Sequence, residues 1–226
     1  MPPKLAIKKF ELGEWMTNCY VIHVEPAASG AGGEPPSTSA DRPCWIIDAG
    51  FEPYRLAAYI RERKLTPQAV LLTHAHLDHI AGLTDLREKW PDLPILIHRE
   101  EEEFLTDPML NLSVVLEEPL VCPRATGFLE HKQSLDIGGL RCEVRHTPGH
   151  SPGGVTFYFP DQALAFVGDT LFAGSVGRTD FPTSDHELLF ESIRSQLLTM
   201  PDDTRVLPGH GPDTTIGREK RSNPFL

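Results

Sequence analysis

The sequence predicts an α/β protein built on antiparallel and mixed β-sheets. Short apolar segments rich in β-branched and aromatic residues recur along the chain, and segments with helical periodicity stand between them. Both halves place several strands before a helix, although the halves share no sequence repeat. Because 226 residues suit one large domain, we expect a single domain over residues 1–226.

The elements of the first half alternate in type. Strands are expected where β-branched and aromatic residues dominate, and helices where apolar residues recur every three to four positions. Pro91 ends the second helix. The expected strands are 17–25 (TNCYVIHVE), 44–50 (CWIIDAG), 67–74 (PQAVLLTH) and 94–98 (PILIH), and the helices are 54–65 and 79–90.

The second half follows the same rules. A long amphipathic helix is expected at 185–198, with Asp185 as its N-cap, because a carboxylate accepts hydrogen bonds from the first free backbone N–H groups. A shorter helix is expected at 215–222, and the acidic run at 99–104 (REEEEF) is interpreted as a solvated helix face. The expected strands are 140–146 (LRCEVRH), 154–159 (GVTFYF), 163–169 (ALAFVGD) and 204–210 (TRVLPGH).

Residues 26–43 (PAASGAGGEPPSTSADRP) are small, polar and rich in proline and glycine. The strands expected on either side read as neighbours, so we interpret this stretch as a flexible loop insertion within the domain and not as a linker.

Composition limits the partners and the location. A net charge of −11 disfavours nucleic acid, which is bound through clustered lysine and arginine. The sequence contains neither a signal-peptide pattern nor an apolar run of bilayer length, so we expect a soluble protein without a membrane partner. Four scattered cysteines without a C-x-x-C pair fit reduced thiols in a cytoplasmic protein. The oligomeric state does not follow from these features.

The stretch LLTHAHLDHIAG (71–82) concentrates metal-ligand chemistry behind an apolar strand. Alternate residues of a strand point the same way, so His74 and His76 can face one ion, and Asp78 and His79 follow at the turn into a helix. Three further apolar strands run into a ligand-type residue beside glycine, namely His150, Asp169 and His210. Loops at one edge of a sheet converge on a single cleft. Five histidines and two carboxylates suffice for two ions that share a carboxylate.

The series H-x-H-x-D-H, T-P-G-H, G-D-T and P-G-H resembles the metallo-β-lactamase superfamily over nearly the whole chain. The resemblance implies an αβ/βα sandwich of two mixed β-sheets flanked by helices, with a binuclear site at one edge. By position, His74, His76 and His150 are the implied ligands of a first ion. Asp78, His79 and His210 are those of a second, and Asp169 bridges both. Exported β-lactamases match less well, because most lack an aspartate at the position of Asp169.

Within the superfamily, GDTLFAGSVGRTDFP and the ending TTIGREKRSNPFL resemble small glyoxalase II-like hydrolases, which cleave acylglutathione thioesters. The sequence continues for sixteen residues after His210, so we expect no counterpart of the family's C-terminal helical domain, which holds glutathione. Arg178 stands where these enzymes carry a lysine that contacts glutathione, so we expect it to bind an anionic part of a small-molecule thioester. The alternative is a structural ion pair between Arg178 and Asp180.

The implied mechanism is hydrolysis by a metal-bound hydroxide, with Asp78 as the catalytic side chain beside it. Two divalent ions are expected, with zinc as the default and iron or manganese as alternatives for this set of nitrogen and oxygen ligands. GRTDF (177–181) is also found in persulfide dioxygenases, which hold one iron through two histidines and an aspartate. That oxidoreductase stays the alternative function, and a non-catalytic metal-binding protein is a third. Outside the motifs, His98 is a candidate for the cleft and His146 for orienting a ligand.

Overall fold

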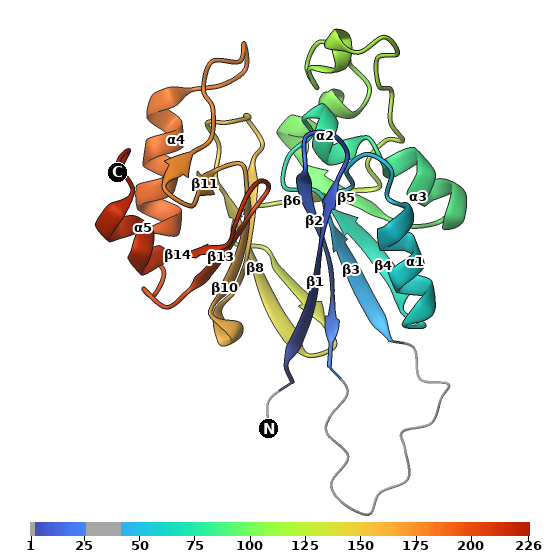
Figure 1. The fold of residues 1–226 in the computed structure, drawn as a ribbon, viewed down its shortest axis with the longest axis horizontal. Coiled ribbons are helices and arrows are strands. Elements are labelled where there is room, and N and C mark those ends of the chain that lie inside the picture. The colour runs from blue at the N-terminus through green and yellow to red at the C-terminus, as the bar shows by residue number, and fades with distance from the viewer. Residues whose placement is uncertain (1–2, 26–41) are drawn as a thin grey trace, which may run out of the picture.

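The computed structural model of the chain describes residues 3–25 and 42–226. Within these residues, two six-stranded sheets face each other, and helices cover their outer sides (Figure 1). Both sheets mix parallel and antiparallel neighbours. The expected αβ/βα sandwich is therefore confirmed.

The first sheet has the strand order β1-β2-β3-β4-β5-β6. Its first three strands pair antiparallel, and the remaining neighbours pair parallel. The strands on either side of the 26–43 stretch are β2 and β3, and they are neighbours as expected. The bounds are β1 Leu5–Leu12, β2 Thr17–Val24, β3 Pro43–Ile47, β4 Thr66–Leu71, β5 Ile95–His98 and β6 Gly127–Leu129.

The second sheet has the order β14-β13-β10-β9-β8-β7, in which β10 and β13 are the parallel pair. A separate two-stranded ribbon, β11-β12, lies beside it. The bounds are β7 Ser134–Ile137, β8 Leu140–His146, β9 Val155–Phe159, β10 Leu164–Gly168, β11 Leu171–Phe172, β12 Ser175–Val176, β13 Arg205–Pro208 and β14 Thr214–Thr215.

The helices α1, α2 and α3 lie beside the first sheet, and α4 and α5 flank the second (Figure 1). The helix expected at 79–90 is two short helices, broken at Gly82. Asp185 caps α4 as predicted, because its side chain accepts a hydrogen bond from Leu188 N. The helices are α1 Tyr54–Glu62, α2 Leu77–Ile80, α3 Leu83–Lys89, α4 His186–Ser192, which continues into the π-helical turn Ile193–Leu197, and α5 Ile216–Ser222. Short 3₁₀ turns span Arg99–Glu101, Glu103–Leu105, Ser113–Val115 and Pro160–Gln162.

The apolar core forms three layers. Along β2, Cys19 and Val21 join the cluster that faces the helices, whereas Tyr20 and Ile22 join the cluster between the sheets. Alternate residues of a strand point to opposite faces, and both faces of β2 are buried. This explains why the strand reads as a continuous apolar run instead of an alternating one.

Three expectations need comment. Most of the 26–43 stretch lies outside the described residues, and Pro43 begins β3. The sequence did not predict the first strand, β1, because lysines interrupt its apolar pattern. Its Phe10 and Leu12 are nevertheless buried, although β1 lies at the edge of the sheet. In the part of the chain that the structure describes, no helix has the length and apolar character needed to cross a bilayer.

Candidate metal centre

The predicted donor residues lie close together beyond the ends of strands from both sheets. β10 and β13 are parallel neighbours, so Asp169 and His210, which follow them, emerge at the same edge. The loop after β4 approaches from the other sheet and carries His74 and His76, and α2 carries Asp78 and His79. Pairing of the strands thus gathers residues that are far apart in sequence.

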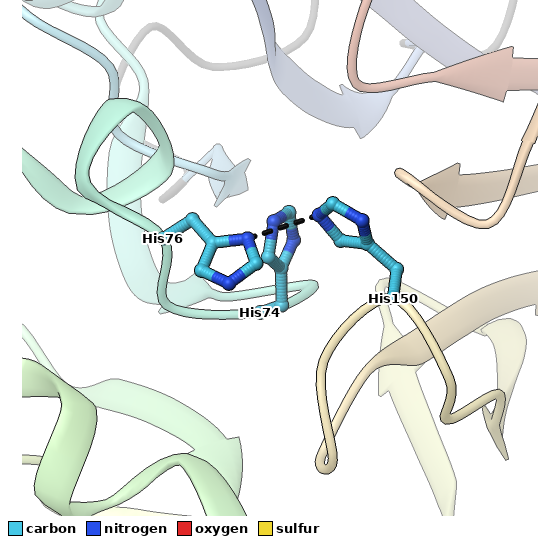
Figure 2. Close-up of side chains that lie close together, drawn as sticks. All are labelled: His74, His76 and His150. Atoms are coloured by element: carbon cyan, nitrogen blue, oxygen red, sulfur yellow. Dashed lines mark hydrogen bonds between the residues drawn. The ribbon is translucent and has the colours of Figure 1, made fainter. Parts of the chain in front are cut away.

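The first group consists of His74, His76 and His150 (Figure 2). Each offers a donor nitrogen within 4.8 Å of those of the other two. His76 Nδ1 lies 2.9 Å from His150 Nε2, and the ring of His74 stands at 90° to that of His76. Three ring nitrogens facing one point are the arrangement that a tetrahedral ion requires from three of its ligands.

The second group consists of Asp78, His79 and His210. Asp78 Oδ2 lies 3.1 Å from His210 Nε2 and 3.5 Å from His79 Nε2. Asp169 stands between the two groups. Its Oδ1 is 3.4 Å from His79 Nε2, and its Oδ2 is 3.5 Å from His210 Nε2 and 3.7 Å from His150 Nε2. A carboxylate in this place can contact two ions at once.

Several of these donor atoms are buried without a partner. The Nε2 atoms of His74, His76 and His79, and Oδ1 of Asp169, accept or donate no hydrogen bond within the described residues. A buried polar atom left unpaired costs free energy, so such atoms are rare in proteins. The unpartnered atoms of His74, His79 and Asp169, together with His76 Nδ1, which faces His150, fit a divalent metal centre whose ions would take these lone pairs.

The charge states of the two groups differ. Burial lowers the pKa of His74, His76 and His150, that of His76 to about 3, so these rings are neutral and ready to coordinate. Burial also acts on His79, but the carboxylates of Asp78, Asp48 and Asp169 outweigh it and raise its pKa. A metal ion that binds the second group therefore displaces a proton from His79.

Sequence reasoning missed Asp48, which follows β3. Its Oδ2 lies 2.8 Å from His79 Nδ1, so the carboxylate fixes the ring with Nε2 toward the cavity. The same carboxylate accepts hydrogen bonds from Thr73 N and Oγ1, both at 2.8 Å, and so holds the start of the loop that carries His74. The signal was present, because an apolar strand runs into Asp48 as another runs into Asp169.

The expectation of a solvated helix face at 99–104 is wrong for Glu101, which is fully buried. Its Oε2 accepts a hydrogen bond from Ala75 N at 3.0 Å, and its Oε1 accepts one from Gly153 N at 2.9 Å. One carboxylate thus joins the loop of His74 and His76 to the loop of His150. The predicted strand geometry of His74 and His76 is also wrong, because β4 ends at Leu71 and this loop holds them instead.

Two glycines show how closely the chain packs around the donors. A Cβ at Gly209 would lie 2.1 Å from Asp169 Oδ1 and 2.7 Å from His79 Cε1, so no larger residue fits there. Gly149 has φ +128°, and a Cβ there would lie 2.3 Å from the backbone of Leu189. The glycines that flank the predicted ligands therefore leave room for neighbouring groups.

Arg178 lines the cleft by its side chain and supports the first group by its backbone. Its carbonyl lies 2.9 Å from His150 Nδ1, which holds that ring with Nε2 toward the cavity. The guanidinium forms two hydrogen bonds with Asp180, at 2.9 and 2.8 Å, and stands 4.6 Å from the centre of the Phe181 ring. The alternative ion pair is thus formed in this structure, and substrate binding by Arg178 stays a prediction.

His98 does not line the cleft. Its ring stacks on that of His146, with centroids 4.1 Å apart. His146 Nε2 lies 2.9 Å from the carbonyl of Pro152, in the loop that carries His150. His146 therefore contacts the backbone of a donor loop and no donor ring.

A cleft of about 550 Å³ opens over the donor groups. Its polar lining comes from the donors, from Arg178 and from the indole N–H of Trp15, and the rest is apolar. The lining residues are Trp15, His76, Leu77, Asp78, Leu112, Val114, Val115, His150, Asp169, Phe172, Arg178, Phe181 and His210.

The region from residue 39 to residue 210, which contains every predicted donor, matches the family model described as "Metallo-beta-lactamase superfamily". The chain belongs to this superfamily. The "Probable metallo-hydrolase YqgX" of Bacillus subtilis is 45% identical over 83% of this chain and 89% of its own length. The "Hydroxyacylglutathione hydrolase GloC" of Haemophilus influenzae is 40% identical over 80% of this chain and 86% of its own length.

Solved structures of the superfamily share the fold over almost the whole chain. TTHA1623 in a di-iron-bound form has a TM-score of 0.80 at 38% identity and covers 97% of this chain and 100% of its own. BLEG-1, described as a B3 metallo-beta-lactamase, has a TM-score of 0.84 at 39% identity over 98% and 99% of the two chains.

Proposed function

We propose that this superfamily member is a binuclear metal-dependent hydrolase that cleaves thioesters of the acylglutathione type. The observation that carries the proposal is the set of unpartnered buried donor atoms at the floor of an open cleft. The name of the relative GloC supports the substrate type.

In this proposal, one divalent ion would be held by His74, His76 and His150, and the other by Asp78, His79 and His210, with Asp169 placed between the two groups. Zinc is the default, and the di-iron form of TTHA1623 keeps iron as an alternative. Bound ions of this kind lower the pKa of water to about 7 and stabilise a developing oxyanion.

The side chains of the protein hold the ions, position the substrate and exclude water. They do not attack the substrate themselves. The described residues that line the cleft include no serine, threonine, cysteine or lysine, so no side chain there is a conventional nucleophile. Asp78 is the proposed catalytic side chain. Its Oδ2 accepts a hydrogen bond of 2.7 Å from Thr17 Oγ1 and stands at the cleft. Burial raises the pKa of this carboxyl, but His79 and His210 outweigh it and hold the pKa well below its usual range, so Asp78 is an ionised acceptor that can orient a water molecule.

Metal content and turnover together test the proposal. The purified protein is loaded with zinc, iron or manganese, its metal is counted by elemental analysis, and hydrolysis of acylglutathione thioesters is measured. We expect about two ions per chain and thioester cleavage. Asp169→Ala is expected to reduce binding at both sites, and His210→Ala to empty mainly the second.

The same samples decide between the alternatives. Oxygen uptake with glutathione persulfide by protein holding a single iron would overturn the hydrolase in favour of a persulfide dioxygenase, the function that residues 177–181 leave open. Hydrolysis of a β-lactam without thioester cleavage would favour the reaction that BLEG-1's description names. Tight metal binding with no turnover of any of these substrates would indicate a non-catalytic metal protein.

A further inference from the structure

The walls of the cleft are apolar next to the donor atoms themselves. The ring of Phe181 lies edge-on to His76 and to His150, with centroids 5.2 and 5.8 Å away. Phe172 stands 6.3 Å from the ring of His210. A substrate whose carbonyl reaches the metal centre therefore has aromatic side chains directly beside that carbonyl.

Trp15, on the turn between β1 and β2, forms another part of the wall. Its backbone carbonyl lies 3.1 Å from His210 Nδ1, and its ring stacks on Phe51 at a centroid distance of 5.3 Å. These two contacts hold the indole at the cleft, although 43% of the residue is exposed. The ring therefore forms part of the surface of the cleft and not of the apolar core.

Val114 and Val115 complete the wall and are 50% and 74% exposed. The turn that carries them is held in place by buried polar groups. Asn111 Oδ1 accepts a hydrogen bond from Ser113 N at 2.9 Å, and the Asn111 carbonyl accepts one from Leu77 N, at the start of α2. A well-anchored turn that exposes two branched apolar side chains beside a metal centre is typical of a ligand-binding wall.

Polar partners for a substrate are scarce in this cleft. Apart from the donors and Arg178, no described residue of the lining offers a hydroxyl, amide or charged side chain. A hydroxyl group next to the reacting carbonyl, as in a lactoyl thioester, would be desolvated with few side-chain partners, namely the donors, Arg178 and the indole N–H of Trp15. An alkyl or aryl group would instead cover Trp15, Val114 and Val115 and displace water from them.

We infer that the cleft selects thioesters with an apolar acyl group of medium size, such as a hexanoyl or benzoyl group, over hydroxyacyl thioesters. The inference rests on the proposed function and names the acyl group that it leaves open. Arg178 lies at the same cleft and stays available for an anionic part of the thiol carrier.

The test compares S-hexanoylglutathione with S-lactoylglutathione, which share a leaving group and differ only in the acyl group. Both are measured on the same sample, so the ratio of their kcat/KM values does not depend on metal loading. We expect the hexanoyl ester to be preferred by about tenfold or more, because a few methylene groups in an apolar pocket discriminate to that extent. Val114→Ser combined with Val115→Ser is expected to bring the ratio close to one. Val121→Ser is the matched control, because Val121 is 66% exposed and does not line the cleft.

Binding of uncleavable thioethers separates this inference from the proposed function. By titration calorimetry on the zinc-loaded protein, S-hexylglutathione is expected to bind about tenfold more tightly than S-methylglutathione, and the double valine variant to lose the difference. If neither thioester is cleaved but this binding difference is present, the hydrolase proposal fails and the inference holds. A preference for the lactoyl ester, or a double variant that matches the Val121→Ser control in both assays, would overturn the inference.

Discussion

Asp48 Oδ2 lies 2.8 Å from Nδ1 of His79, and both side chains are buried. The ring nitrogen donates to the carboxylate, which leaves Nε2 of His79 facing Asp78 and Asp169 at 3.5 and 3.4 Å. A carboxylate behind a coordinating imidazole sets its tautomer and its basicity. The pair therefore prepares the second donor group before any ion arrives.

Asp48→Asn is expected to weaken metal binding at the second site. An amide oxygen can still accept the hydrogen bond from His79, but the negative charge that makes the ring a stronger ligand is lost, and the amide NH2 then faces Thr73 N. We expect the affinity for the second ion to fall by about 10- to 100-fold, and the affinity for the first ion to fall less, through the loop of His74 that Thr73 begins. Elemental analysis after dialysis against graded chelator measures this, and the exposed Asp203→Asn is the control. Equal loss of both ions would contradict the assignment of Asp48 to His79.

Glu101→Gln is expected to destabilise the protein and loosen the first site. The amide keeps one acceptor oxygen, so an N–H of either Ala75 or Gly153 is left facing another donor in a buried place. An unsatisfied buried group costs about 1–3 kcal/mol, which lowers the melting temperature by several degrees. Calorimetry of metal-free and loaded protein measures both effects. The control is Glu100→Gln, at a neighbouring exposed residue. Equal melting temperatures for the two variants would show that the Glu101 carboxylate does not stabilise the fold.

Arg178→Ala is expected to raise KM for an anionic thioester several-fold with kcat largely kept. Contacts to a remote anionic group are equally strong in the ground and transition states. Their loss therefore raises KM and leaves kcat unchanged. Lysine at this position should recover part of the effect. Asp180→Ala, which removes both acceptor oxygens of the guanidinium, is expected to leave KM equal or lower. An unchanged KM in Arg178→Ala together with a lowered melting temperature would assign Arg178 to structure alone.

The four cysteines are expected to be unreactive in the folded protein. All four are buried, and burial raises their pKa, to about 12 for Cys44 and Cys122. A raised thiol pKa keeps the neutral form at every pH below it, and the thiolate is the reactive species. At pH 8 a thiol-specific chromogenic reagent should therefore detect no rapidly reacting cysteine in native protein and four in denaturant. A fast reaction in the native state would show that a thiol reaches solvent.

The seven predicted donors show how much of the candidate site can be predicted from local sequence pattern. His150, Asp169 and His210 each come shortly after an apolar strand with a glycine beside them, and the structure places them together with the H-x-H-x-D-H residues. The ends of paired strands meet at one edge of a sheet, so strand pattern and ligand type predicted which residues come together there; that they bind metal stays a prediction. The strand β2 was equally readable, because a strand buried on both faces shows a run of mostly apolar residues instead of an alternation.

The residues that support the donors depend on which segments meet in space. Glu101 is one of four consecutive acidic residues, and nothing local distinguishes it from its exposed neighbours. It is buried because the turn after β5 packs against the loops of Ala75 and Gly153, from 26 residues before it and 52 residues after it. The apolar wall of Trp15, Val114 and Val115 arises in the same way, from two turns separated by about a hundred residues that flank one cleft. Periodicity and motif spacing report on neighbours along the chain, whereas burial and hydrogen bonding between distant segments depend on the packing of the two sheets.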